Sequence, residues 1–408
     1  MPSLPTGPVR ARLFDPEFAA DPARTYARLR EYGDVVPVEL APGVPATLII
    51  GYTAALEVLR DPVTFPKDPR RWEKRVSRDC PVLPLMMYRP NCMYTDGNVH
   101  ARLRQVVTDG LVSVDPNVLR DHVENSAEAL IREFRSAGEA DLLGQFARPL
   151  PLMVFSQALG CPPDLSERLA AHYKGIFDGV DAKRANAGLT RGVAELIALK
   201  RQNPEHDLAS RILAHPAGLS DEEALHQVLL LMGAGAEPEQ NLIANTLRLM
   251  LTSDQVAGDV WGGNLLIEDA LDELLWTDPP IANFAFTYPE RDVEFRGVLL
   301  PADQPVVISF AAANTDPSTA SGNRVGNRAH LAWGGGPHAC PAKRPAQLIA
   351  TVAIERLLDS LPGMEPAVPA AELEWRTGPF HRALTALPVR FPPVFGGTGD
   401  AHRARSGR

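Results

Sequence analysis

The sequence predicts a mainly α-helical fold with small β-sheets (α+β), arranged as a single large domain over residues 1–395. Two patterns support this prediction. Apolar residues recur at helical spacing in a body that covers about residues 100–280 and 343–362. Alternating apolar and polar residues with turn signals predict β-structure at about residues 35–52, 281–307 and 370–392. The polar tail that follows, residues 396–408, is expected to be flexible.

Individual elements follow from the same periodicity. Between the first strands and the helical body, residues 61–95 are rich in Pro and Arg and are expected to form a long irregular loop. Loops of that length in a compact domain usually have a function or are disordered. The expected helices are residues 22–32, 53–59, 118–134, 150–159, 193–200, 225–251, 265–276 and 343–361.

Composition excludes several classes of protein. With 45% hydrophobic and 22% charged residues, the 408-residue chain can bury a large core and is globular. A net charge of -9 argues against a nucleic-acid-binding protein, which needs clustered Lys and Arg. The N-terminus has no apolar signal sequence, and no apolar run approaches the roughly 18 residues of a spanning helix. We therefore expect a cytoplasmic protein with neither a membrane nor a nucleic-acid partner.

Cys340 is the most informative residue. The four cysteines of the chain are too sparse for a disulfide framework, and a lone cysteine is usually a small buried apolar residue. Cys340, however, follows Gly334, Gly335, Gly336 and Pro337, a tight loop that can approach a flat cofactor, and it precedes an expected helix. A helix N-terminus stabilises a thiolate, and thiolate is the form of cysteine that ligates iron.

The segment around Cys340 resembles the haem-binding loop of the cytochrome P-450 superfamily, Phe-Gly-x-Gly-x-His/Arg-x-Cys-x-Gly. Trp333 stands for the Phe, His338 for the basic residue, Cys340 for the iron ligand and Ala342 for the last Gly. The resemblance implies haem b as the cofactor, held between a central distal helix and the proximal Cys loop.

Other landmarks occur in the order of bacterial, actinobacterial-type members of that family, which supports the resemblance. His100 and Arg104 resemble the pair that binds the haem propionates, and residues 233–246 resemble the helix across the distal haem face. Residues 311–318 and 387–391 also match in place.

Three positions depart from the family pattern. The Glu-x-x-Arg pair is replaced by Glu273 and Trp276, so Arg cannot brace the proximal side. Pro238 replaces the distal Thr whose hydroxyl helps to supply protons for dioxygen cleavage, although the preceding acid, Glu237, is kept. Thr287 occupies the place of an Arg that binds a propionate. The plain alternative at Pro238 is a helix kink, and for Glu237 it is a salt-bridged carboxylate.

The candidate site residues divide by role. The candidate catalytic residues are Glu237, Pro238 and Ala234. The expected cofactor-binding residues are His100, Arg104, Ala234, Trp333, Gly334, His338, Cys340 and Ala342, with Cys340 as the metal ligand. The expected substrate-binding residues are Met86, Met87, Tyr88, Ile281, Phe284 and Phe380.

The function that the resemblance implies is a haem-thiolate monooxygenase of secondary metabolism, which oxidises a small organic or peptide substrate. Electrons are expected from a ferredoxin and its ferredoxin reductase, with Arg102, Lys343 and Arg344 as candidate docking charges. Two alternatives stay open: oxidative aryl or peptide cross-linking without oxygen insertion, and a non-catalytic haem- or ligand-binding regulatory protein.

Overall fold

A computed structural model describes residues 10–177, 182–253, 266–319 and 326–395. The α-helices within these ranges are α1 (Pro16–Ala20), α2 (Pro22–Arg30), α3 (Tyr52–Arg60), α4 (Arg70–Glu73), α5 (Leu83–Met86), α6 (Gly97–Val112), α7 (Pro116–Phe134), α8 (Pro149–Ala158), α9 (Pro163–Phe177), α10 (Ala182–Gln202), α11 (Leu208–Leu213), α12 (Asp221–Thr252), α14 (Ile267–Thr277), α15 (Phe310–Asn314) and α16 (Lys343–Ser360). Four further short turns are the π-helix η1 (Leu143–Ala147) and the 3₁₀ helices η2 (Leu331–Trp333), η3 (Gly336–His338) and η4 (Ala370–Glu372).

The strands form three sheets in the described part of the chain. The largest has the order β1-β2-β3-β8-β5, in which β1 and β2 and also β3 and β8 are parallel, and the other neighbours are antiparallel. The others are β4-β10-β9 and the hairpin β6-β7. The strands are β1 (Ala11–Arg12), β2 (Val35–Ala41), β3 (Val44–Ile49), β4 (Glu139–Asp141), β5 (Asn283–Thr287), β6 (Val293–Phe295), β7 (Val298–Leu300), β8 (Val306–Ser309), β9 (Glu365–Pro366) and β10 (Pro388–Arg390).

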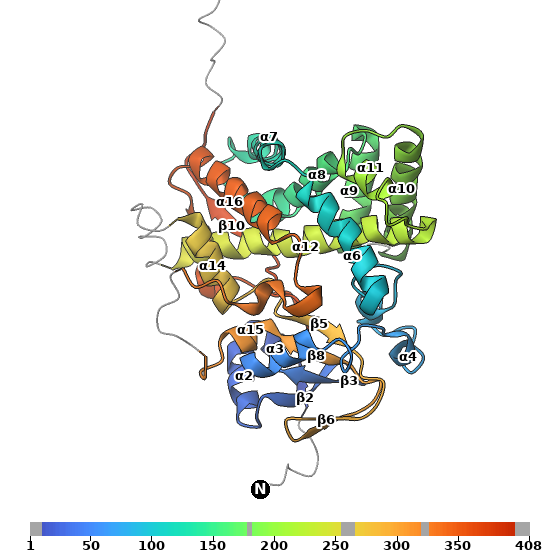
Figure 1. Cartoon of the computed structure of the whole chain (residues 1–408). Coiled ribbons are helices and arrows are strands. Elements are labelled where there is room, and N and C mark those ends of the chain that lie inside the picture. Colours follow the sequence, from blue (N-terminus) through green and yellow to red (C-terminus); the bar gives the residue numbers. More distant parts are fainter. Residues whose placement is uncertain (1–9, 178–181, 254–265, 320–325, 396–408) are drawn as a thin grey trace, which may run out of the picture.

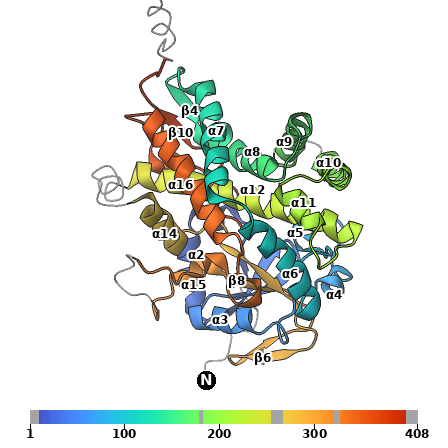
Figure 2. The same ribbon diagram turned by 45° about the horizontal axis from the view of Figure 1, so that its top comes forward.

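The helices and the main sheet occupy different parts of the molecule. In Figure 1 the helical body lies above and the sheet of β2, β3, β5 and β8 lies below, with α12 running across the middle. Helix α16 packs against α7, α12 and α14, so the segment that follows Cys340 is built into the helical core (Figure 2). The architecture confirms the predicted α-rich fold with small sheets.

Helix α12 is the longest element. A capping box starts it, in which Ser220 and Glu223 each accept a hydrogen bond from the other's backbone N–H. The helix continues through Pro238, even though proline removes one backbone donor. Its buried residues continue to Met250, so tertiary packing stabilises the helix where propensity does not.

Two local differences separate the structure from the sequence prediction. The segment 61–95 is not wholly irregular, because it contains α4 and α5. The predicted β-rich segment 370–392 is mostly non-repetitive, with β10 as its strand. The predicted tail 396–408 lies outside the described residues, and none of the described helices is both long and apolar enough to cross a membrane.

Candidate active site

Glycine geometry shapes the loop that carries Cys340. Gly334 and Gly336 have positive φ angles of 70° and 63°, a region that other residues rarely adopt. A Cβ atom on Gly336 would also collide with the carbonyl of Leu59, because α3 lies directly against the loop. The backbone N–H of Cys340 donates to the carbonyl of Trp333 over 2.7 Å, which closes the loop just before α16.

A cavity separates this loop from α12. Its walls are mainly apolar, with Phe155, Phe284, Phe286 and Phe310 among them. The middle of α12 supplies Leu230, Leu231, Ala234, Gly235, Pro238, Glu239 and Leu242. The facing segment supplies Ala332, Trp333, Gly334, His338, Cys340, Pro341 and Ala342. The cavity therefore has the two walls that a flat cofactor needs, with Cys340 on one and Pro238 on the other.

Cys340 is exposed, and the space it faces is this cavity. Desolvation by the surrounding protein raises the pKa of its thiol above the ordinary value. The backbone N–H of Ala342 and the charge of Arg104 act in the opposite direction and favour the thiolate. The expected helix-terminus effect is thus present as one contribution, but burial outweighs it in the protein alone.

A cluster of basic side chains lies at one end of the cavity. Arg104 donates to the carbonyl of Ala339, and the His100 ring packs on the His338 ring with 4.0 Å between centroids. His338 Nε2 lies 3.3 Å from a carboxylate oxygen of Asp96. Burial lowers the pKa of His100 to about 4 and also lowers that of His338, with neighbouring cationic groups adding to the effect at both rings. Arg104 and His338 line the cavity, whereas His100 lies behind His338.

The two acidic residues beside Pro238 point in different directions. Glu237 borders a second cavity and forms an ion pair with Arg376, with His381 Nδ1 3.7 Å from its carboxylate. Burial opposes ionisation, but His381 and Arg376 outweigh it and lower the pKa of Glu237. The structure thus favours the salt-bridged alternative for the carboxylate that the sequence suggested as a distal acid.

Among the described residues, Glu239 is the one whose carboxyl group lines the cavity between α12 and the Cys340 loop. The residue is 4% exposed, and Oε1 has no hydrogen-bond partner among the described residues. Burial raises its pKa well above the ordinary value, despite a backbone hydrogen bond from Ala350. Glu239 was not among the site residues expected from the sequence, although an acid directly after Pro238 is visible there.

Pro238 and Ala234 both line the cavity, one helical turn apart on α12. Because proline has no backbone N–H, the carbonyl of Ala234 does not receive the usual helical hydrogen bond from position 238. Pro238 thus brings neither a side-chain hydroxyl nor a backbone N–H to this wall of the cavity.

The predicted substrate residues only partly reach this cavity. Ile281 and Phe284 line it, but Phe380 borders the second cavity and packs behind Phe286, with ring centroids 5.0 Å apart. Met86 is fully buried against the sheet, and Met87 is a partly exposed surface residue.

The backbone N–H of Tyr88 donates to the Glu73 carboxylate, and the Arg70 guanidinium stacks over the Tyr88 ring. From the same loop, Cys92, Met93 and Tyr94 line the cavity in place of Met86, Met87 and Tyr88. The turn of α5 directs Met86 towards the sheet, which sequence periodicity alone did not reveal.

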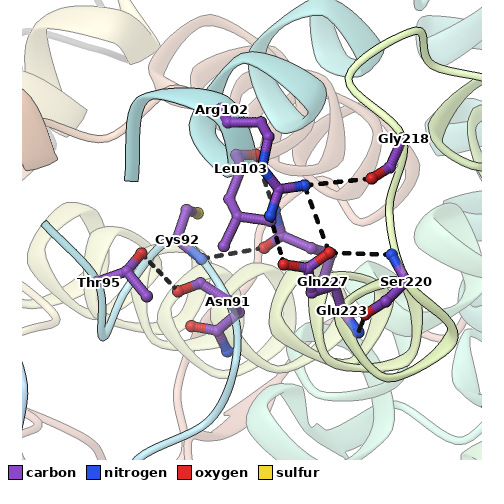
Figure 3. A network of polar contacts seen from close by, with 9 residues as sticks. All are labelled: Asn91, Cys92, Thr95, Arg102, Leu103, Gly218, Ser220, Glu223 and Gln227. Atoms are coloured by element: carbon purple, nitrogen blue, oxygen red, sulfur yellow. Dashed lines mark hydrogen bonds and ion pairs between the residues drawn. The ribbon is translucent and has the colours of Figure 1, made fainter. Parts of the chain in front are cut away.

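A polar network fixes the loop that carries these replacements (Figure 3). The buried side chain of Gln227 accepts from the backbone N–H of Cys92 and donates to the carbonyl of Leu103. Nearby, Arg102 forms an ion pair with Glu223 at the start of α12. The network joins the loop, α6 and α12, so Arg102 serves this junction and is not a free surface charge (Figure 3).

The proximal side contains a second polar cluster near Trp276. The Trp276 indole N–H donates to the carbonyl of Asn327 over 2.6 Å, and its ring meets His330 edge-on. Asp272 binds Arg328 at 2.7 Å and lies 3.8 Å from His330. Burial would raise the pKa of Asp272, but the nearby His330 ring and the hydrogen bond from Arg328 outweigh that effect and lower it.

Curated relatives match nearly the whole chain. The cytochrome P-450 monooxygenase PikC of Streptomyces venezuelae is 31% identical over 389 residues, which cover 92% of both proteins. Cytochrome P-450 107B1 of Saccharopolyspora erythraea is 32% identical over 406 residues, covering 95% of this chain and 99% of the relative. The chain belongs to the cytochrome P-450 superfamily.

Solved P-450 structures share the fold. CYP154C4 from a Streptomyces species superposes with a TM-score of 0.84 at 27% identity, covering 95% of this chain and 99% of that structure. CYP267B1, a myxobacterial cytochrome P-450 in complex with myristic acid, has a TM-score of 0.81 at 27% identity. The match covers 93% of this chain and 98% of that structure. A comparison with protein-family models gave no match.

The residues of this P-450 fit its cofactor, haem b. The Trp333 indole Nε1, on a residue that lines the cavity, is buried without a hydrogen-bond partner among the described residues, as expected of a group that a polar ligand would satisfy. Cys340 faces the cavity, and Arg104 and His338 lie at one end of it, where carboxylates can be neutralised. The chain is an oxidoreductase of the P-450 monooxygenase type.

Proposed function

We propose that this P-450 binds haem b through Cys340 and oxidises an apolar small organic or peptide substrate of secondary metabolism. One observation carries the proposal: the thiol of Cys340 and the middle of α12 face each other across a mainly apolar cavity. Haem bound in this way supplies the oxidising chemistry, with the thiolate favouring cleavage of the O–O bond. Phe155, Phe284 and Phe286 exclude water and select an apolar substrate by burying its surface.

Proton supply in this site rests on Glu239 and on the substrate. Glu237 is held by Arg376 outside the cavity between α12 and the Cys340 loop, and Pro238 has no hydroxyl. Glu239, whose raised pKa favours a protonated carboxyl, holds a proton within the cavity wall. A polar group of the substrate can order water beside Pro238, so proton supply depends on what is bound.

Electrons are proposed to come from a ferredoxin and its reductase in the cytoplasm. An acidic ferredoxin requires cationic side chains near the proximal loop. Arg344 is exposed and Lys343 is partly exposed at the start of α16, three to four residues beyond Cys340. Arg102 is less suited to this role, because Glu223 already neutralises it.

The direct test is turnover with a surrogate ferredoxin pair under isotopically labelled dioxygen, with products analysed by mass spectrometry. A library of apolar substrates, including fatty acids and macrocycles, is compared with polar compounds of equal size. Incorporation of one labelled oxygen into an apolar substrate supports the proposal. Turnover restricted to small polar compounds contradicts the proposed substrate class.

Oxidative bond formation without oxygen insertion is a second candidate. It is favoured by the loss of the hydroxyl at Pro238 and by a structural relative, the P-450 CxnD for C–S bond formation in chuangxinmycin biosynthesis, with a TM-score of 0.82 at 27% identity. The same labelled-dioxygen experiment separates the two reactions, because a coupled product keeps no labelled oxygen.

A further inference from the structure

A cation from another segment, Lys67, contacts the strand that carries Thr287. Thr287 lies at the end of β5, where its hydroxyl is directed to the carbonyl of Val306. The backbone beside it contains a register irregularity between Phe284 and Thr287, and Ala285 has a φ of 53°. That conformation is uncommon for alanine and indicates a bulge held by its surroundings.

Lys67 is the group that meets this bulge. Its Nζ donates to the carbonyls of Ala285 and Phe286 over 3.0 and 3.1 Å. The segment before α4 is fixed from both sides, because the backbone N–H of Tyr288 donates to Pro66 and the backbone N–H of Lys67 donates to Asp96. The ammonium group is thus placed beside Thr287 by contacts that do not depend on a flexible surface.

The charge of Lys67 is poorly balanced in the protein alone. The residue is 8% exposed, and its ammonium hydrogen bonds go to neutral carbonyls, which leaves one of its three N–H groups for another acceptor. The nearby carboxylate, Asp96, already accepts from the Lys67 backbone and lies beside His338. Burial lowers the pKa of Lys67 to about 8, so the ammonium form still dominates at neutral pH.

Lys67 also lines the cavity together with Arg104 and His338. Among the described residues, the Lys67 ammonium is hydrogen-bonded to carbonyls and forms no salt bridge, and Asp96 is the carboxylate whose charge acts on it. A buried excess of positive charge calls for an anionic ligand. We propose that Lys67 binds a propionate carboxylate of the haem. It would thereby replace the arginine that the family has at the position of Thr287. This role concerns cofactor binding and holds whichever oxidation the enzyme performs.

The test measures haem loss from the holoenzyme with two forms of the cofactor. Lys67→Gln keeps a donor for the carbonyls but removes the charge, and Lys67→Met removes both. Each variant and the wild type are reconstituted with haem b or with its dimethyl ester, and transfer of the haem to an acceptor globin gives the dissociation rate. Lys74→Met, which changes an exposed lysine of the same segment, is the matched control.

With haem b, both Lys67 variants are expected to lose the cofactor about tenfold faster than the wild type, the scale of one charge-assisted hydrogen bond. With the dimethyl ester, wild type and variants should lose it at similar rates, because the carboxylate is gone. Equal penalties with both cofactors, or no penalty with haem b, would overturn the proposal and leave Lys67 as an anchor of the β5 bulge.

Discussion

The two walls of the cavity relate to the sequence in different ways. The Cys340 wall is made by consecutive residues whose glycines fix the backbone, with Cys340 facing the cavity. The α12 wall is made by residues spaced around a helix, where rotation decides which side chains face inwards. In the loop, the local sequence therefore determines which side chain faces the cavity. On the helix, the packing of the rest of the fold determines it.

The largest expected effect comes from breaking the loop wall at Gly336. Gly336→Ala places a Cβ against the carbonyl of Leu59 at a positive φ angle, so α3 or the loop must move. We expect a loss of about 3 kcal/mol in unfolding free energy and reduced haem occupancy. Denaturant unfolding and the haem-to-protein absorbance ratio measure both effects. Gly297→Ala, at a positive φ without neighbours, is the control for backbone strain alone, and an equal loss there would contradict the steric explanation.

The next largest effect tests the cluster behind the loop. Trp276→Arg replaces an indole that is hydrogen-bonded to Asn327 and packed on His330, and it adds a guanidinium to a segment that already contains Arg328. We expect destabilisation of about 3 kcal/mol, as for a buried charge in an incomplete pair. Trp276→Phe should cost only about 1 kcal/mol, for the hydrogen bond. A higher melting temperature of Trp276→Arg at full haem occupancy would show that Glu273 accepts the arginine after all.

The residues named from the sequence on the loop side all line the cavity, whereas on α12 Glu237 does not, and the difference has a physical reason. Positions 237 and 239 are about 200° apart around a helix, so one faces the cavity and the other faces away. Which one faces inwards is set by the packing of α12 against α8, α14 and α16. The placement of Lys67 could not be predicted from the sequence for a similar reason, because its hydrogen-bond partner Phe286 is 219 positions away in the chain. The fold class needed only periodicity and motif order, which the sequence contains.

The opposite pKa shifts of Glu239 and Glu237 predict opposite pH dependences for their contributions to folding stability. The raised pKa of Glu239 means that the folded protein holds its proton longer than the unfolded chain. Its contribution to stability therefore falls as the pH rises above the ordinary value of 4.5, by up to about 1.4 kcal/mol per pH unit until the raised pKa is reached. Glu239→Gln should remove this loss. The free energy of unfolding of the variant, relative to that of the wild type, should therefore increase as the pH rises.

Glu237→Gln is the matched control with the opposite sign. The lowered pKa of Glu237 means that its ion pair stabilises the protein above the ordinary pKa and that this contribution is lost as the pH falls through the lowered one. The variant should be about 1 kcal/mol less stable than the wild type near neutral pH and should approach it in acid. Unfolding of the holoenzymes over about pH 3 to 8 measures both trends. Parallel trends in the two variants would contradict the assignment of the two faces of α12.

The smallest expected effect concerns coupling at Pro238. Pro238→Thr restores a hydroxyl that lines the cavity and should raise the amount of product formed per NAD(P)H consumed a few-fold, with less peroxide released. A misplaced proton relay can cost roughly 10² in rate, and part of that cost is already offset by substrate or Glu239. Added peroxide should partly bypass the defect in the wild type. Tight coupling of the wild type with a substrate that lacks any polar group near the reacting carbon would mean that Pro238 only shapes the helix.

The carbon monoxide difference spectrum of the reduced protein tests the central claim most directly, because it reports the axial ligand itself. The account predicts the red-shifted Soret band of thiolate ligation in the wild type, since Cys340 is the thiol on the loop wall of the cavity, opposite the middle of α12. Cys340→Ser should lose that band while keeping the fold. A Cys340→Ser protein with the unchanged red-shifted band would contradict the account, because another residue would then be the ligand.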